Sequence, residues 1–335
     1  MAAFFSFLIR FLPRAVTQGI PLLFGCTGEI LTEKSGNLNL GIPGIMYVGG
    51  ISGIIGGYFY ETGCTDAGIT PNTALLIIIP LLCSLLGSGL MALLYSFLTI
   101  TLRANQNVAG LALTIFGEGI GNFFGGTLVK LAGHGSAEIK LGATSNAFRT
   151  VLPFAEKLGW FGKLFLSYGF LAYMAIVIAV VVAIILKKSR VGLKLRAVGE
   201  NPATADAVGI NVTRYKYVAT VVGGMIAGLG GLYYVMDYQM GTWANDGALG
   251  ARGWLAIALV IFALWKPNVC IFGSILFGGL YILYNYVGVA RNIEPLFNML
   301  PYAVTILVLI ITSVRKKREH QPPASLGLPY FREER

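Results

Sequence analysis

Two strongly apolar runs of the sequence are separated by the polar stretch Lys187-Lys-Ser-Arg-Val-Gly-Leu-Lys-Leu-Arg-Ala-Val-Gly-Glu-Asn-Pro-Ala-Thr-Ala-Asp-Ala-Val-Gly-Ile-Asn-Val-Thr-Arg214. Asn201 suits a helix N-cap, because its side-chain oxygen can accept a free amide of the first turn. Pro202 suits the first helical position, and Gly209 can end the helix in a left-handed conformation. The stretch predicts a short helix over 202–208, suited to docking; the alternative is a solvated loop with an incidental helical turn. Five cations precede this helix, namely Lys187, Lys188, Arg190, Lys194 and Arg196.

The composition around this stretch is that of a membrane protein. The chain has 335 residues, of which 56% are hydrophobic and 12% charged, and soluble domains carry about twice that charged fraction. Several charge-free runs reach the roughly 20 residues that span a bilayer, which makes a soluble enzyme a poor alternative. The net charge of +10 does not indicate nucleic acid, because the cations gather at the ends of apolar runs.

Catalytic and metal sites are not predicted. The cysteines Cys26, Cys64, Cys83 and Cys270 form no CxxC pair, so neither a zinc site nor a disulfide framework is expected. The two histidines, His134 and His320, fall in loops expected on opposite sides of the membrane. The sequence has no G-x-x-x-x-G-K-[ST] phosphate loop and no recognisable nucleophile–base pair. We therefore expect no metal, no cofactor and no catalytic residue. Because the chain has no phosphate loop, any energy from ATP must come from a partner protein.

The apolar runs predict an all-α integral membrane protein with about nine crossings, in a range of about eight to ten. Basic residues place the 187–214 loop and the tail in the cytoplasm. The run 253–265 is too short to cross alone, but the tail is inside only if this run crosses too. The same count puts Arg10 and Arg14 outside, so either Met1–Leu12 also inserts or the two arginines lie at the outer headgroups. The expected crossings are Ala15–Leu31, Ser35–Tyr60, Asn72–Leu102, Val108–Leu128, Leu164–Leu186, Tyr217–Met236, 253–265, Asn268–Ala290 and Pro295–Val314.

Two apolar runs begin with glycine-rich, polar backbone, at 35–60 and at 240–265. Irregular backbone at membrane depth is tolerated only where it is buried in protein or lines a cavity. The two segments enter from opposite sides, which predicts an inverted repeat. We expect one transmembrane domain over residues 1–314, containing the cytoplasmic loop 187–214, followed by a cytoplasmic tail at 315–335.

Polar side chains at expected membrane depth predict the translocation path. An intramembrane carboxylate such as Glu118 is by default a functional candidate, although a structural pair with another helix is an equal alternative. Amides offer donors and acceptors without charge, which suits a neutral polar solute. The candidate path residues are Asn37, Asn39, Gln106, Asn107, Glu118 and Asn122.

Five blocks carry a resemblance to ABC importer permeases of the branched-chain amino acid/ribose superfamily. They are Gly19-Ile-Pro-Leu-Leu with Glu33-Lys-Ser-Gly-Asn-Leu-Asn-Leu-Gly41, Arg103-Ala-Asn-Gln-Asn-Val-Ala-Gly-Leu-Ala-Leu113, Gly192-Leu-Lys-Leu-Arg-Ala-Val-Gly-Glu-Asn-Pro202 with Gly209-Ile-Asn-Val212, Gly250-Ala-Arg-Gly-Trp-Leu-Ala-Ile-Ala-Leu-Val-Ile-Phe262, and Leu326-Gly-Leu-Pro-Tyr-Phe-Arg-Glu-Glu-Arg335. The blocks at 103–113 and 192–212 resemble the nucleoside branch. One departure is Gly41-Ile-Pro-Gly44, where Pro43 replaces the glutamate usual in the family.

The resemblance implies a permease subunit that imports nucleosides, with ribose or another simple sugar as the alternative. It implies as partners ATP-binding subunits, a second permease subunit in an expected heterodimer, an extracellular substrate-binding lipoprotein and the lipid of a prokaryotic cell membrane, and no nucleic acid. The stretch Gly199–Gly209 resembles the coupling helix that fits a groove of the ATPase. The implied ATPase-coupling residues are Glu200, Asn201, Pro202, Ala203, Ala205, Asp206 and Gly209.

Two other classes remain as alternatives. An ion-coupled secondary carrier would use Glu29, Glu118 and Asp237 as a relay. A self-powered carrier needs no ATPase dock, however, so the helix expected at 202–208 argues against it. A membrane enzyme is disfavoured because His and Asp are scarce in the apolar runs.

Overall fold

The structure, a computed structural model, describes residues 2–131, 139–151, 153, 155–243, 248–287, 293–315 and 321–332. Helices dominate it, and the only strands within those residues are β1 (Ile139–Lys140) and β2 (Thr242–Trp243). These two pair antiparallel, with Ile139 opposite Trp243 and Lys140 opposite Thr242. The long helices are α1 (Ala2–Glu33), α2 (Ile42–Asp66), α3 (Thr73–Ser96) with η1 (Phe97–Thr101), α4 (Gln106–Leu131), α7 (Phe170–Lys188) and α10 (Val212–Tyr233) with η3 (Tyr234–Tyr238).

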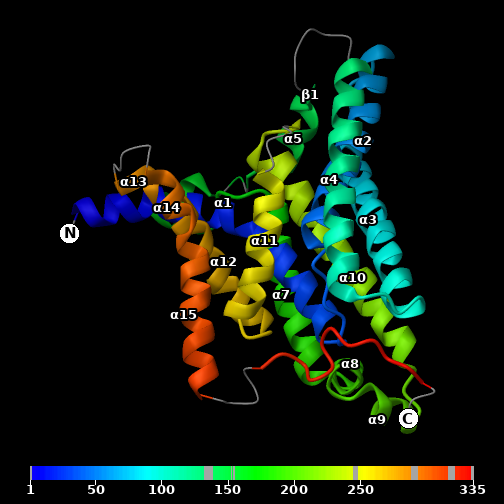
Figure 1. Cartoon of the computed structure of the whole chain (residues 1–335). Coiled ribbons are helices and arrows are strands. Elements are labelled where there is room, and N and C mark those ends of the chain that lie inside the picture. The colour runs from blue at the N-terminus through cyan, green and yellow to red at the C-terminus, as the bar shows by residue number, and fades with distance from the viewer. Residues whose placement is uncertain are drawn as a thin grey trace.

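The remaining helices are shorter. Most of them lie at the two ends of the bundle, whereas α11, α12 and α15 run along it (Figure 1). They are α5 (Gly142–Phe148), η2 (Glu156–Leu158), α6 (Gly159–Phe165), α8 (Arg190–Glu200), α9 (Pro202–Ala207), α11 (Ala248–Phe262), α12 (Pro267–Ile282), α13 (Tyr284–Val287), α14 (Glu294–Asn298) and α15 (Leu300–Arg315).

Within the described residues, six helical segments are long and apolar enough to cross a membrane. They are Phe7–Glu33, Ile42–Asp66, Thr73–Thr101, Gln106–Lys130, Phe170–Lys188 and Val212–Tyr238. Three shorter apolar helices follow at Leu249–Phe262, Pro267–Ile282 and Pro295–Ile311. The predicted all-α membrane class is confirmed, whereas the count of about nine crossings stays a prediction.

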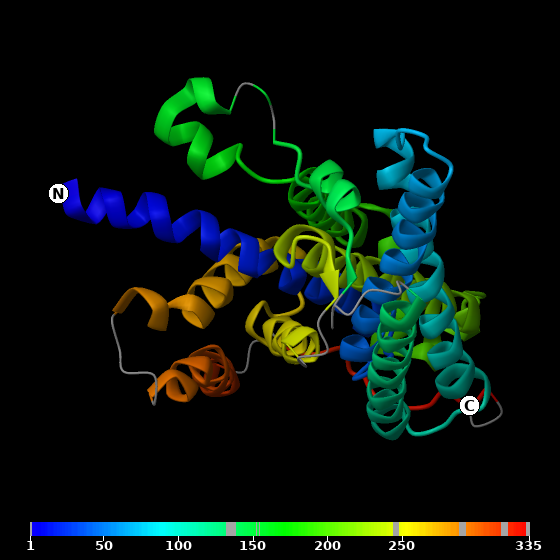
Figure 2. The same ribbon diagram turned by 90° about the horizontal axis from the view of Figure 1, so that it is seen from above.

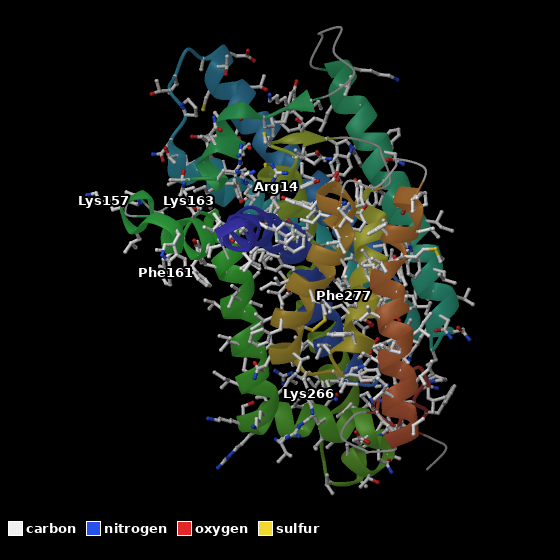
Figure 3. All side chains as sticks on the ribbon, turned by 90° about the vertical axis from the view of Figure 1, so that its left-hand side faces the viewer. Arg14, Lys157, Phe161, Lys163, Lys266 and Phe277 are labelled. Carbon is white, nitrogen blue, oxygen red and sulfur yellow. A yellow bond between two sulfur atoms is a disulfide. The ribbon has the colours of Figure 1, made fainter. Side chains whose placement is uncertain are left out.

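The first helix is longer than the sequence pattern predicted. From Ala2 onward the apolar start is continuous with the first crossing, and Pro13 and Pro21 both lie inside α1. Proline removes a helix hydrogen bond and bends the axis. The N-terminal part of α1 accordingly runs across the bundle and extends away from it (Figures 1 and 2). Arg14 lies toward the same end as Lys157 and Lys163, opposite Lys266 (Figure 3).

Glycines let the central helices α1, α2 and α10 touch through their backbones. A Cβ added to Gly28 of α1 would lie 2.2 Å from the carbonyl oxygen of Gly223 in α10. A Cβ added to Gly49 of α2 would lie 2.5 Å from the Cα of Gly228 in α10. Small residues permit this close approach. Membrane helices depend on it, because the hydrophobic effect does not drive them together inside a lipid bilayer. Within the core, the backbones of these helices are therefore in direct contact at the glycines.

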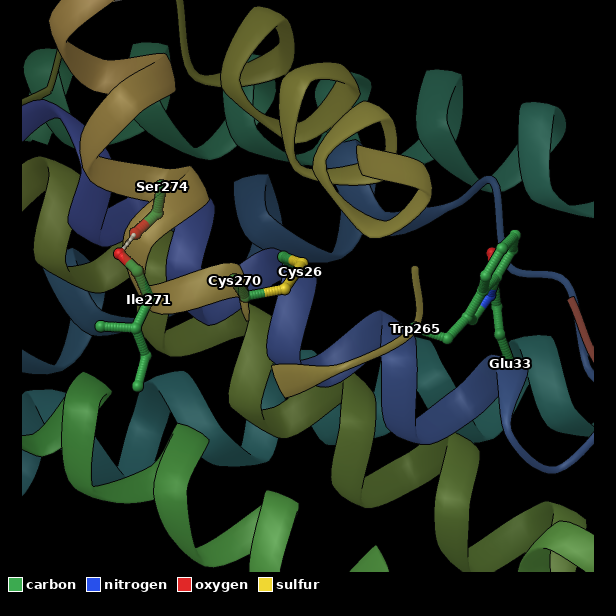
Figure 4. Close-up of a disulfide and its surroundings, with 6 residues drawn as sticks. All are labelled: Cys26, Glu33, Trp265, Cys270, Ile271 and Ser274. Atoms are coloured by element: carbon green, nitrogen blue, oxygen red, sulfur yellow. Dashed lines mark hydrogen bonds between the residues drawn. A yellow bond between two sulfur atoms is a disulfide. The ribbon is translucent and has the colours of Figure 1, made fainter. Parts of the chain in front are cut away.

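The expectation that the cysteines form no disulfide is wrong for one pair. Cys26 of α1 and Cys270 of α12 are joined by a disulfide, with their Cα atoms 6.8 Å apart (Figure 4). The residues are 244 positions apart in sequence, so spacing alone could not indicate that α1 and α12 pack side by side. Cys64 and Cys83 are free. His134 and His320 lie outside the described residues.

The run expected at 253–265 forms part of a helical hairpin. Its helix α11 begins earlier, at Ala248, and ends at Phe262. Leu264 and Trp265 then both adopt φ near +54°, a left-handed conformation that reverses the chain before α12. Helix α12 ends at Ile282, so the crossing expected at Asn268–Ala290 is shorter than predicted.

Candidate functional site

Helices α8 and α9 lie across one end of the bundle, at the end where the chain terminates (Figure 1). The predicted caps of the short helix are confirmed. The Asn201 side chain accepts a hydrogen bond from the Thr204 amide at 3.0 Å, and Pro202 is the first helical residue. Gly209 follows the helix with φ of +82°. The sequence analysis missed α8, which the Ser189 side chain caps by accepting from the Gly192 amide at 2.9 Å.

The two sides of α9 have different surroundings. Ala205 is 2% exposed and packs with Val198 of α8 and Val212 of α10, so it anchors the helix to its own chain. Thr204, Ala207 and the following Val208 are exposed, and Val208 is 71% exposed. Of the predicted coupling residues, Glu200, Asn201 and Gly209 are exposed, whereas Pro202, Ala203 and Asp206 are half-buried. The exposed residues leave part of α9 open to solvent, whereas Ala205 packs against its own chain.

The C-terminal tail, residues 321–332, is fastened to this end of the bundle. Tyr330 donates its hydroxyl to Asp206 Oδ2 of α9 at 3.0 Å, and Arg332 Nε lies 3.1 Å from the same oxygen. The Ser325 amide and hydroxyl both donate to the carbonyl of Gly199, at 3.0 and 2.6 Å. The tail therefore holds α8 and α9 at separate points. Nothing in the sequence of the tail predicts these contacts.

The turn that follows α1 contacts both the tail and α8. The Gly36 carbonyl accepts from the amide of Gly327 in the tail, at 3.3 Å. A Cβ added to Gly199 would lie 2.4 Å from the carbonyl oxygen of Lys34, so the turn and α8 are in backbone contact. Burial lowers the pKa of Lys34, although the nearby carboxylates of Glu200 and Glu33 oppose that shift. A displacement of α8 would therefore also displace the turn at the end of α1.

Asn37 and Asn39 are fully buried and hold the irregular turn between α1 and α2. The Asn37 side-chain amide donates to Thr220 Oγ1 of α10 at 3.2 Å. The Asn39 amide donates to Glu29 Oε1 at 2.9 Å, and its side-chain oxygen accepts from the Gly41 amide at 2.9 Å. Among the described residues, Asn37 Oδ1, Asn39 Nδ2 and Glu29 Oε2 have no hydrogen-bond partner. Irregular backbone at this depth is thus satisfied by side chains, as its polarity predicted.

Only one of the other four predicted path residues joins these asparagines. Gln106 is buried, accepts from the Leu38 amide at 2.7 Å and donates to the Leu328 carbonyl of the tail at 3.4 Å. Asn107 is exposed at the start of α4. Glu118 is half-buried beside Gly250 of α11, and Asn122 is exposed. Glu118 and Asn122 lie about 18 and 24 Å along α4 from Gln106, at 1.5 Å per residue.

Two buried polar contacts were not predicted. Glu33 at the end of α1 accepts from the indole of Trp265, which lies beside it in Figure 4. Arg252 of α11 is 4% exposed and donates to Gln18 Oε1 at 2.8 Å. Its guanidinium carbon lies 4.4 Å from the centre of the Tyr234 ring. The charged residue types were visible in the sequence, but their partners are more than 200 positions away.

Comparison with known proteins reveals relatives along nearly the whole chain. Residues 12–309 match the family described as branched-chain amino acid transport system / permease component. A putative glucose ABC transporter permease of Haloferax volcanii is 30% identical, over 98% of this chain and 99% of the relative. A guanosine ABC transporter permease of Bacillus subtilis is 27% identical, over 96% and 97%. A nucleoside ABC transporter permease of Lactococcus lactis is 29% identical, over 87% and 88%.

The family consists of permease components, which lack an ATPase site of their own. Its membrane-spanning character agrees with the apolar helices of this chain. The chain therefore belongs to the branched-chain amino acid transport system / permease component family, as a multi-pass membrane protein.

Proposed function

We propose that the chain is the permease subunit of an ABC importer that moves nucleosides into a prokaryotic cell. The observation that supports the import mechanism is α9, a capped helix that leaves Thr204 and Ala207 exposed, while its Ala205 is buried in its own chain. ATP-binding subunits would dock on these exposed residues, and an extracellular lipoprotein would deliver the solute. The chain would pair with a second, different permease subunit.

The proposed topology has nine crossings in a single domain over residues 1–314. The three shorter apolar helices would complete the six long ones, with the segments at 35–60 and 240–265 as the broken elements of an inverted repeat. The 187–214 loop and the 315–335 tail would lie in the cytoplasm. The disposition of Arg14 and Lys266 toward opposite ends supports this count. Reagents that cannot cross the membrane, applied to single cysteines in whole cells, would test the orientation.

Docking is tested by crosslinking. A cysteine in place of Ala207, which is exposed on α9, should crosslink to the ATP-binding subunit of the complex. Lys188, exposed at the end of α7, gives the matched control, and a cysteine there should crosslink far less. Val208→Asp should reduce ATP-driven uptake while leaving the protein in the membrane. Uptake at the parental rate with Val208→Asp would remove the docking assignment.

The proposed path runs past Asn37, Asn39, Gln106, Asn107, Glu118 and Asn122. Buried amides with unused hydrogen-bonding atoms, such as Asn37 Oδ1, support this route for a neutral polar solute. Weak binding is expected along it, because a tight site would retain the solute. Water-soluble thiol reagents should reach single cysteines at these positions in the working complex. Protection of all six would contradict the route.

Nucleosides are proposed as the solute because relatives described as guanosine and nucleoside permeases match 96% and 87% of this chain. The 30% identical relative described as a putative glucose permease supports a sugar as the second candidate. Uptake of labelled guanosine, uridine, ribose and glucose should be compared in cells with and without the gene. A gene-dependent loss confined to the sugars would reverse the order of the candidates.

A further inference from the structure

A cavity of about 740 Å³ opens beside the coupling helix, between η1, the start of α10 and the tail. Its walls include Thr99 and Ile100 from η1, Lys216 from α10, and Tyr330 and Arg332 from the tail. The volume lies within the range of small-molecule binding sites. The proposed function gives this space no role.

Lys216 is the residue that marks the cavity as a binding site. Its side chain belongs to a residue only 3% exposed, one turn inside α10, and it lines the cavity wall. Among the residues that the structure describes, no hydrogen bond or ion pair reaches its ammonium group. A buried charge without a partner is costly, so it usually neutralises, reaches water or binds a counter-ion. The cavity supplies room for a counter-ion.

Three more cations line the same cavity. Arg103, Arg214 and Arg332 all line the cavity, whereas its single acidic lining residue, Asp206, already contacts Arg332 and Tyr330. The first turn of α10 also lines it, and a helix N-terminus carries a partial positive charge. The chemistry selects an anion, and clustered arginine and lysine suit a phosphate group.

Apolar side chains continue from the cavity toward the membrane. Val218 of α10 lines the wall and is 55% exposed, and Val222 one turn further is 40% exposed. On the other side, Phe97 of η1 is 46% exposed, and Leu102, which follows η1, is 58% exposed. A ligand with a phosphate and a hydrocarbon chain would satisfy both surfaces. Basic pockets between membrane helices on the cytoplasmic side are known to suit anionic lipid headgroups.

We propose that this cavity binds the phosphate group of an anionic phospholipid, with its acyl chains along the exposed apolar side chains of η1 and α10. Lys216 contacts the phosphate directly. The bound lipid joins η1, the start of α10 and the tail beside α9. The site depends on neither the transported solute nor the docking of an ATPase.

The test measures lipid binding to the purified full-length chain. Native mass spectrometry would count phosphatidylglycerol retained in mixed micelles, with phosphatidylcholine as the neutral comparison. Lys216→Gln should weaken phosphatidylglycerol binding roughly tenfold or more, the effect of losing a charged hydrogen bond. Lys216→Arg should retain it. Lys188→Gln removes an exposed cation near the cytoplasmic end of α7 and should leave it unchanged.

The remaining outcomes separate the sources of the anion. Equal binding by the parent and Lys216→Gln, with equal melting midpoints in phosphatidylcholine, would overturn the proposal. So would equal retention of the two lipids by the parent. Inorganic phosphate should raise the melting midpoint of the parent little; a rise that Lys216→Gln abolishes, without selective lipid binding, would assign the cavity to a free phosphate compound. An effect of Lys216→Gln seen only with the ATP-binding subunit present would assign it to an acidic surface of that partner.

Discussion

Removing the hydroxyl of Tyr330 should loosen the tail from the coupling helix. Tyr330→Phe deletes the 3.0 Å hydrogen bond to Asp206 but leaves the ring packed against the cluster of Val198, Ala205 and Val212. The carboxylate is not left alone, because Arg332 Nε stays 3.1 Å away. The variant therefore isolates one hydrogen bond.

The magnitude follows from the exposure of the partners. A hydrogen bond to a charged group contributes about 1.5–3 kcal/mol, and the lower end applies because this bond is only partly buried. The ion pair adds less, since the Arg332 side chain is 73% exposed and solvent screens it. A loss of about 1.5 kcal/mol raises the population of the detached tail roughly tenfold.

Hydrogen–deuterium exchange of the purified chain reports this detachment. The amides of Ser325 and Gly327 donate to carbonyls of Gly199 and Gly36, so they are protected only while the tail is bound. Their exchange should accelerate roughly tenfold in Tyr330→Phe, because exchange follows the open population. A matched control is Tyr60→Phe, which removes a hydroxyl that accepts from the Asn72 amide, far from the tail in sequence.

The variant Tyr330→Ala separates the two contributions of the side chain. It removes the ring as well as the hydroxyl, so exchange should be faster than in Tyr330→Phe. Parental exchange in Tyr330→Phe together with fast exchange in Tyr330→Ala would refute the reasoning, because packing alone would then hold the tail.

Three further changes test other parts of the structure. Gly228→Ala should lower the melting midpoint by overpacking the core, at a cost of about 1–3 kcal/mol, whereas Gly126→Ala, with no atom within 4 Å of the added Cβ, should not lower it. Gly209→Ala should cost about 1–2 kcal/mol and accelerate amide exchange in α9, since φ is +82° there; unchanged exchange would exclude strain as the reason for glycine. Trp265→Phe removes the donor to the buried Glu33 and should cost about 1–3 kcal/mol in thermal unfolding, and a parental midpoint would show that the contact contributes nothing.

Local chemistry made some features predictable. The capping by Asn201, the first-turn Pro202 and the left-handed Gly209 depend on neighbouring residues alone, and all three are confirmed. The polar segment after α1 was predicted to be irregular because its side chains conflict with a lipid-facing helix. The apolar runs were predicted as helices from their composition alone. The ends of these helices differ from the predicted ends where proline or left-handed residues occur.

Long-range contacts were not predictable from one sequence. Asp206 and Tyr330 are 124 residues apart, and nothing local to either indicates the other. The burial of Ala205 was not predictable for the same reason. The sequence of a short helix shows which residues share a side, but not which side packs against the bundle. The pairing of Cys26 with Cys270 likewise depends on how α1 and α12 meet.

The backbone contacts among α1, α2 and α10 restrict how the protein can move. Side chains that interdigitate can slide by changing rotamers, but backbone atoms in contact have no such freedom. Where these glycines touch, at Gly28 with Gly223 and at Gly49 with Gly228, we therefore expect the three helices to move together. A cycle that exposes a path first to one side of the membrane and then to the other must place its hinges outside this trio. Helices α4 and α12 also meet the trio through glycines, at Gly44 and Gly278, so helices without such contacts to it, such as α7 and α15, are the elements left to supply that motion.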